Sequence, residues 1–198
     1  IDIEDIAADI ATDFGVLPNA IQVIPNGVDT ELFRALPDVT RKSDQLIATA
    51  SADAPLKGLA VLLQAFKLLS VDRPALQLVL IASPKPGGDT EALISQLQLG
   101  DRIHFVGGVS HADIVRLYAE STVAVVPSLY EGFGLPAVEA MASGIPLVSS
   151  DGGALAEVVG DGGLLVPAGD AKALAEAVDV VFLDQLNIDF YSHCFVTL

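Results

Sequence analysis

The sequence predicts a doubly wound α/β domain with a mostly parallel sheet. Segments with strand and helix patterns alternate from Gln45 to Phe182, which is typical of βαβ units. The expected strands are near-continuous apolar runs, such as Thr122-Val-Ala-Val-Val126, and these runs indicate burial on both faces of a sheet. At 198 residues the chain can bury one substantial core. We therefore expect one sheet with helices packed on both sides.

The regular part of the chain divides into strands and helices of ordinary length. Strands are expected over Leu46–Ala50, Leu76–Ala82, Ile103–Val106, Thr122–Val126, Pro146–Ser149 and Leu164–Val166. Helices are expected over Lys57–Leu69, Asp89–Leu99, Ser110–Ala119, Leu135–Ala142, Gly153–Val158 and Ala171–Phe182. Ser110 and Asp170 stand where an N-cap side chain would accept a hydrogen bond from a free backbone N–H.

The ends of the chain differ from this regular middle. Asp2–Phe14 has apolar residues at helical spacing, and Ile21–Ile24 has the pattern of a short strand. Residues 29–44 are polar and irregular, which is typical of a linker. Residues 184–198 lose the alanine- and valine-rich character of the middle and form an atypical tail.

The composition excludes several classes of protein. Ten Lys and Arg against 26 Asp and Glu give a formal net charge of −16, which argues against nucleic-acid binding. No apolar stretch reaches the roughly 20 residues that a membrane span requires, and we expect neither a transmembrane segment nor a signal peptide. The single cysteine, Cys194, excludes a disulfide within this chain and favours a cytoplasmic location.

The turn Glu131-Gly-Phe-Gly134 lies between an expected strand and an expected helix. Such a strand–turn–helix exposes backbone N–H groups that bind anions. Glu131 precedes the turn and Glu139 follows one helical turn later, and carboxylates accept hydrogen bonds from hydroxyls. Each Glu alone is more simply a solvated residue, but their placement around the two glycines favours a shared site. The combination predicts a ligand with phosphates and hydroxyls, such as a nucleotide sugar.

Lys57 opens an expected helix, where its positive charge is unfavourable to the helix dipole. A nearby anion would explain it, although a solvated surface lysine is the simpler alternative. His104 is interpreted as a core or edge histidine and His111 as a surface one. His193 and Cys194 fall short of the three or four ligands that zinc requires, and no acidic cluster suggests magnesium, so we expect no metal and no cofactor.

Several motifs between residues 20 and 180 resemble the donor-binding C-terminal domain of GT-B glycosyltransferases. The family is the retaining family 4, glycosyl transferases group 1, and its E-x7-E signature matches the spacing from Glu131 to Glu139. The motifs that carry the resemblance are Ile24-Pro-Asn-Gly-Val-Asp29 with Phe33, Pro55-Leu-Lys-Gly-Leu59, Val106-Gly107, Pro127-Ser-Leu-Tyr-Glu-Gly-Phe-Gly-Leu-Pro136, Glu139-Ala-Met-Ala-Ser-Gly144, Gly152-Gly153 with Glu157, and Val166-Pro-Ala-Gly-Asp170.

The resemblance implies a Rossmann-like fold, one half of a GT-B enzyme, and a role for each site residue. Lys57 and Glu131 are implied as catalytic, with Lys57 neutralising the diphosphate leaving group and Glu131 near the donor sugar. Glu139 is implied to hold the ribose hydroxyls. Further donor-binding positions are implied at Gly132, Phe133, Gly134 and Leu135 for phosphate or sugar, and at Ile103, Phe105 and Val106 for the base.

The resemblance also implies partners and a division of the chain. The donor would be a UDP-, GDP- or ADP-sugar, and the acceptor would bind to an N-terminal domain, through which peripheral membrane contact could occur. Residues 1–40 would be the remnant of that domain with a linker, residues 41–183 the nucleotide-sugar-binding domain, and residues 184–198 the atypical tail. One departure concerns the phosphate clamp, because the family's Arg shortly before Lys-Gly falls here in Ser51-Ala-Asp53.

Three other functions are weighed against the transferase. A non-catalytic nucleotide-sugar-binding or regulatory module could keep the same fold, and Glu131→Ala would distinguish it by its effect on transfer. A GT-B epimerase or phosphorylase is disfavoured by the E-x7-E match. A nicotinamide dehydrogenase is disfavoured because the G-x-G-x-x-G fingerprint is missing after the first regular strand.

Overall fold

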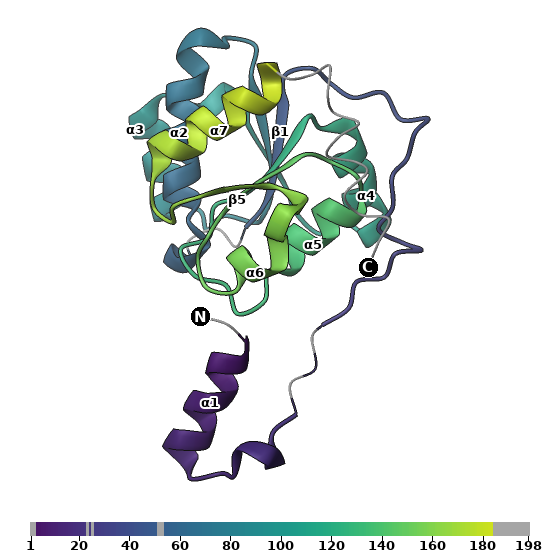
Figure 1. The fold of residues 1–198 in the computed structure, drawn as a ribbon. Coiled ribbons are helices and arrows are strands. Elements are labelled where there is room, and N and C mark those ends of the chain that lie inside the picture. Colours follow the sequence, from purple (N-terminus) through teal and green to yellow (C-terminus); the bar gives the residue numbers. More distant parts are fainter. Residues whose placement is uncertain (1–2, 23, 25, 51–53, 184–198) are drawn as a thin grey trace.

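The computed structural model describes residues 3–22, 24, 26–50 and 54–183. Its centre is a six-stranded sheet in the order β3-β2-β1-β4-β5-β6, and all neighbouring strands are parallel (Figure 1). This is the strand order of a Rossmann-like, doubly wound domain, so the predicted fold class is confirmed. The strands are β1 Gln45–Thr49, β2 Gln77–Ile81, β3 Ile103–Val106, β4 Val123–Val126, β5 Leu147–Ser150 and β6 Leu164–Val166.

Helices cover both faces of this sheet, with α2, α3 and α7 on one side and α4, α5 and α6 on the other (Figure 1). Every predicted helix of the regular region is present, with ends shifted by a few residues. The helices are α1 Ile3–Phe14, α2 Leu59–Asp72, α3 Asp89–Leu97, α4 His111–Glu120, α5 Leu135–Ala142, α6 Leu155–Val159 and α7 Ala171–Leu183.

The strands alternate their side chains between two separate cores. On β1, Leu46 and Ala48 join the core under α2 and α7, whereas Ile47 joins the core under α4 and α5. Two apolar cores form because successive strand residues point to opposite faces and each face has its own helices. A fully buried leucine contributes about 1.5–3 kcal/mol relative to an exposed one. The continuous apolar runs in the sequence are therefore explained by burial on two sides.

Both predicted N-caps are present. Ser110 Oγ accepts a hydrogen bond from Asp113 N at 3.2 Å, and the Asp113 carboxylate accepts from Ser110 N at 3.0 Å, which completes a capping box at the start of α4. Asp170 Oδ1 accepts from the backbone N–H groups of Lys172 and Ala173 at the start of α7. His104 lies exposed on the edge strand β3 and His111 lies exposed at the start of α4, as predicted.

Two local expectations are wrong. Ile21, Gln22 and Ile24 lie outside regular secondary structure, so the strand predicted over Ile21–Ile24 is absent from its described residues. No strand of the described sheet pairs with this segment, and an isolated strand has no partner for its backbone groups. Lys57 does not begin α2, because it ends the short 3-10 turn Pro55–Lys57 and is separated from α2 by Gly58.

The segment before the sheet consists of a helix, α1, followed by an irregular stretch. Helix α1 stands apart from the α/β domain, and residues 26–44 run along the outside of the domain before entering β1 (Figure 1). Phe33 from this segment is buried in the core under α4 and α5, where its ring lies 6.0 Å from that of His111. The predicted linker is therefore irregular, as expected, but its middle is anchored to the domain by an aromatic side chain.

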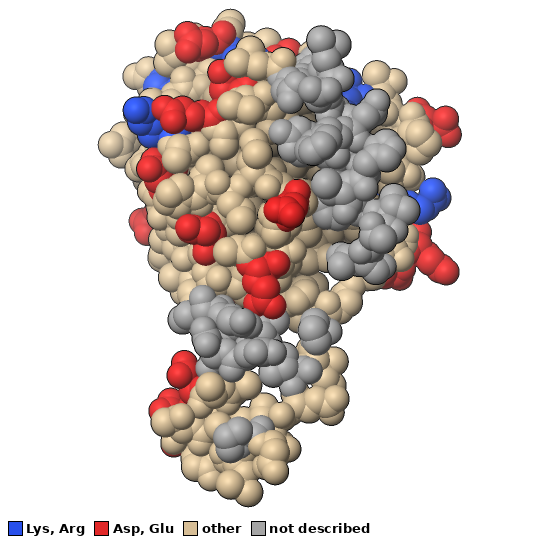
Figure 2. All heavy atoms as spheres, in the orientation of Figure 1, with Lys and Arg blue, Asp and Glu red and all other residues tan. Residues whose placement is uncertain are grey.

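Among the charged side chains of the visible face, acidic ones predominate (Figure 2). On the visible face, Asp and Glu are spread over most elements, whereas Lys and Arg gather mainly near its margins (Figure 2). Among the described residues, no helix has the length and apolar character needed to cross a membrane. The predicted tail, residues 184–198, and Ser51–Asp53 lie outside the described residues.

Candidate functional site

Glu131 lies at the centre of the loop that follows β4, and its side chain is almost entirely buried, with 8% of the residue exposed. Its Oε1 atom accepts two hydrogen bonds, from Lys57 Nζ at 2.7 Å and from Ser128 Oγ at 2.9 Å. Lys57 comes from a loop 74 residues earlier in the chain, and its side chain is 35% exposed. The fold thus brings together the two residues that the sequence predicted as catalytic, and one of them remains open to solvent.

Backbone hydrogen bonds join the loops around Glu131. Leu129 N donates to Leu56 O at 2.8 Å, which fixes the loop after β4 against the turn that carries Lys57. On the other side, Glu131 N donates to Gly152 O at 3.3 Å and Ala154 N donates to Glu131 O at 3.0 Å. The loops after β1, β4 and β5 therefore form one hydrogen-bonded unit at the carboxyl edge of the sheet.

Two glycines permit this close approach of the loops. Gly58 has φ +64°, and a Cβ atom there would overlap the carbonyl oxygen of Pro127. Gly153 has φ +66°, and a Cβ atom there would overlap the carbonyl oxygen of Glu131. Only glycine meets both demands without strain, since it adopts positive φ freely and has no side chain to collide.

The turn after Glu131 leads into α5. Gly134 is the N-cap of α5 with φ +97°, and Pro136 occupies the first turn, where a missing N–H costs nothing. Gly132 and Leu135 are exposed, and Phe133 is half-buried. The first backbone N–H groups of a helix have no acceptor within the helix, and binding of an anion at this turn stays a prediction.

Glu139 lies on α5 and is half-buried. Burial raises the pKa of its carboxyl group, while the neighbouring His111 acts in the opposite direction. Its negative charge also adds to the rise in the pKa of Tyr118, which is caused mainly by burial. Glu139 is thus a partly desolvated acceptor, separate from the Lys57–Glu131 pair.

A pocket of about 340 Å³ opens beside Lys57. It is lined by the carboxyl ends of two adjacent strands, by Lys57 and by the start of α5, namely Thr49, Ala50, Lys57, Ile81, Ala82, Ser83 and Pro136. The two strands are β1 and β2, and α5 follows β4 in the chain. The strand order reverses between β1 and β4, and ligands of doubly wound sheets bind at the carboxyl edge beside this point. The pocket therefore lies where the fold predicts a ligand.

The residues that the resemblance implied for the base have less direct access to this pocket. Ile103 is buried in the core under α2, Phe105 is packed against the same core, and Val106 lies against the opposite core. The loop after β2 lines the pocket instead, through Ala82 and Ser83. Thr49, Ser83 and Ser128 were not predicted as site residues, although each is a small polar residue at or just beyond the end of a strand, and that position was the available signal.

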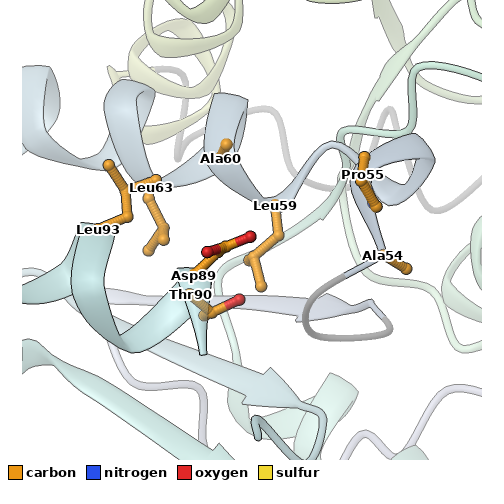
Figure 3. A pocket seen from close by; sticks show the side chains of 8 residues that line it. All are labelled: Ala54, Pro55, Leu59, Ala60, Leu63, Asp89, Thr90 and Leu93. Carbon is orange, nitrogen blue, oxygen red and sulfur yellow. The ribbon is translucent and has the colours of Figure 1, made fainter. Parts of the chain in front are cut away.

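A second, mostly apolar pocket of about 210 Å³ lies between the starts of α2 and α3. Figure 3 shows Asp89 and Thr90 of α3 facing Leu59 and Leu63 of α2. Ala54 and Pro55 lie at one end of this pocket, so it adjoins the loop after β1. In the described part of the chain, no group of three or more His, Cys, Asp or Glu is placed to hold a metal ion.

Comparisons with known proteins agree on one family. The family model for glycosyl transferases group 1 matches residues 36–193. An MMP α-(1→4)-mannosyltransferase of Mycolicibacterium hassiacum is 48% identical over 174 residues, which are 88% of this chain and 40% of that protein. This chain thus spans less than half the length of that curated relative.

Two solved structures have the same fold. The C-terminal domain of a glycosyl transferase group 1 family protein (LpcC) from Francisella tularensis superposes with a TM-score of 0.71 and 25% identity, over 84% of this chain and 93% of that one. Anabaena Alr3699/HepE, solved in complex with UDP and glucose, gives a TM-score of 0.76 at 24% identity, over 92% of this chain and 52% of that one. The chain belongs to glycosyl transferases group 1 and has the fold of the C-terminal domain of a GT-B enzyme.

Proposed function

We propose that this chain is the donor-binding domain of a retaining glycosyltransferase that moves a hexosyl unit from an NDP-sugar to an acceptor hydroxyl. The observation that carries the proposal is the pairing of Lys57 with the buried Glu131 at 2.7 Å, beside a pocket at the carboxyl edge of the sheet. A cation that lines a pocket and an acceptor-only side chain next to it match the two chemical halves of an NDP-sugar, the diphosphate and the sugar.

Each site residue has a distinct task in this proposal. Lys57 neutralises the charge that develops on the departing diphosphate, and the exposed turn from Gly132 to Leu135 adds backbone N–H donors. Glu131 holds the donor sugar close to the reacting carbon, and Glu139 accepts hydrogen bonds from the ribose hydroxyls. Catalysis then consists mainly of positioning and of stabilising the leaving group, and we expect no metal to be required.

The electrostatics of the chain make Lys57 central. A formal net charge of −16 repels an anionic donor, so local positive charge is needed to hold it.

The similarity to a mannosyltransferase makes mannose the first donor sugar to test, and the UDP bound by Anabaena Alr3699/HepE makes UDP the first nucleotide. We place the enzyme in the cytoplasm.

The remainder of the active site would be supplied by a second domain. The M. hassiacum relative is much longer than this chain, and we propose that the acceptor binds to the part of the enzyme outside residues 1–198. The isolated chain should then bind donor weakly and transfer little sugar. Robust transfer by residues 1–198 alone would contradict this division of labour.

Calorimetric titration with UDP, GDP, ADP and their mannose and glucose derivatives tests the donor site. We expect binding of at least one of these compounds, and Lys57→Ala should weaken it by about 10-fold or more, because a hydrogen bond to a charged group contributes about 1.5–3 kcal/mol. Lys172→Ala is the matched control, since Lys172 is an exposed lysine of α7 that pairs only with Glu176 in the described chain. Equal affinities for the Lys57→Ala and Lys172→Ala chains would contradict the proposed diphosphate contact.

A further inference from the structure

Two buried serines lie next to Glu131, one bonded to its carboxylate and the other to the backbone of the first. Ser128 follows β4 and Ser150 ends β5, and both are at least 97% buried, with 3% and 2% of each residue exposed. Ser150 Oγ donates to the backbone carbonyl of Ser128, and Ser128 Oγ donates to Glu131 Oε1 at 2.9 Å. A buried hydroxyl is costly unless it is hydrogen-bonded, so these serines are held in fixed orientations.

The two donors to Glu131 differ in what a ligand can do to them. Lys57 is partly exposed and lines the pocket, so an arriving diphosphate competes with Glu131 for its ammonium group. Ser128 is buried and uncharged, so it offers no site to the diphosphate. When Lys57 turns to a bound anion, Ser128 remains as the donor that holds the Glu131 carboxylate.

The geometry also divides the work between the two oxygens of Glu131. Lys57 and Ser128 both donate to Oε1, and none of the hydrogen bonds of the described residues ends on Oε2. A carboxylate bound through one oxygen has the other available as an acceptor. This second oxygen is the acceptor that the proposed function requires for a hydroxyl of the donor sugar.

We infer that Ser128 is a positioning residue for the donor sugar: it fixes Glu131 through Oε1, so that Oε2 accepts a hydroxyl of the sugar while Lys57 serves the diphosphate. This role rests on the proposed function. It predicts that the Ser128 hydroxyl matters for the sugar half of the donor and not for the nucleotide half.

The test compares, in the whole 198-residue chain, the dissociation constants for a nucleoside diphosphate and for its sugar derivative. UDP with UDP-glucose and GDP with GDP-mannose are the two pairs of probes. In Ser128→Ala, the ratio of the sugar-nucleotide constant to the diphosphate constant should rise about 10-fold above the wild-type ratio, which is the loss of one hydrogen bond to a charged group. The diphosphate constant itself should change by less than about 2-fold.

Ser70→Ala is the matched control, because Ser70 is also a buried serine and its hydroxyl donates to a backbone carbonyl within α2, away from Glu131. This variant should leave the ratio unchanged. Ser128→Cys has nearly the size of serine and keeps a weak donor, so its ratio should lie between those of the wild type and Ser128→Ala. It also provides the measurement if the alanine variant does not fold.

Each outcome decides between specific alternatives. An unchanged ratio in Ser128→Ala, or an equal loss for diphosphate and sugar nucleotide, would overturn the positioning role and leave the donor site standing. If the wild-type chain bound none of the four probes and neither ADP nor an ADP-sugar, the proposed function itself would fail, and the role of Ser128 with it.

Discussion

The loops at the carboxyl edge are packed differently in the two halves of the sheet, β3-β2-β1 and β4-β5-β6. Beyond β4 and β5, the loops are joined by backbone hydrogen bonds, and Gly153 is packed so closely that a Cβ atom would collide with Glu131. Beyond β2 and β3, the loops also touch, since Ala82 N donates to Val106 O and a Cβ atom at Gly107 would overlap Ser83 Oγ. A pocket nevertheless opens at Ser83, and a Cβ atom at Gly108 would meet nothing within 4 Å. The loops after β4 and β5 therefore close around Glu131, whereas the loop after β2 lines an open pocket.

This difference shows how one fold can hold a charged group in a fixed position and also leave space for a ligand. A group that stabilises charge must be held in place before the ligand arrives, because reorganising it during the reaction would cost free energy. In the proposed function a nucleotide enters and leaves, which requires that its side of the site is not closed by backbone contacts. Lys57 lies at the boundary, bound to Glu131 on the fixed side and lining the pocket on the open side.

The largest effect is expected from placing the same substitution in each half. Gly153 and Gly108 have nearly the same φ, +66° and +67°, so alanine strains the backbone of both to a similar degree, by about 1–2 kcal/mol. Only at Gly153 would the added methyl group also overlap a backbone carbonyl. We expect Gly153→Ala to lower the free energy of unfolding by about 3 kcal/mol or more, and Gly108→Ala by only the backbone cost. Urea denaturation measures both, and equal losses would show that the two edges are packed alike.

A smaller effect is expected where the two halves are tied together. The hydroxyl of the buried Tyr118 lies 3.3 Å from Thr49 Oγ1 at the end of β1 and 3.4 Å from the carbonyl oxygen of Pro136 in α5. Tyr118→Phe should lower the free energy of unfolding by about 1 kcal/mol through the loss of these contacts. Tyr130→Phe, which changes an exposed tyrosine of the loop after β4, should leave thermal stability unchanged. Equal thermal midpoints for the two variants would mean that the contacts of the Tyr118 hydroxyl with Thr49 and Pro136 do not stabilise the fold.

The smallest effect concerns the pH dependence of stability. Burial raises the pKa of Glu139 in the folded chain above its unfolded value, so the folded state binds a proton more tightly there. This carboxyl therefore reduces the free energy of unfolding as the pH rises from its unfolded pKa through its folded one. Glu139→Gln removes that loss, and its stability relative to the wild type should increase with pH across this window. Denaturation curves at several pH values measure the difference, and a gap that is constant or shrinks with pH would contradict the assigned environment.

The regular elements were predictable because their signals are local. Apolar runs and helical spacing located the six strands of the described sheet, and the side chains of Ser110 and Asp170 marked two helix starts correctly. The strand expected at Ile21–Ile24 was wrong because strand formation depends on a neighbouring strand, which no local pattern reveals. The displacement of Lys57 into a 3-10 turn has a similar origin, since Gly58 is set by its contact with Pro127, 69 residues further along the printed sequence.

For the site, the sequence by itself determined which chemical groups are available: two carboxylates with seven residues between them, a glycine-rich turn in that interval and a lysine in a distant loop. These are residue types at short spacings, and the turn and helix around them follow from local geometry. The tertiary structure alone decided that Lys57 and Ser128 share one oxygen of Glu131, and that Glu139 remains outside this pair. The physical reason is that parallel strands bring the ends of distant segments to one edge, where the fit between backbones selects the side chains that meet.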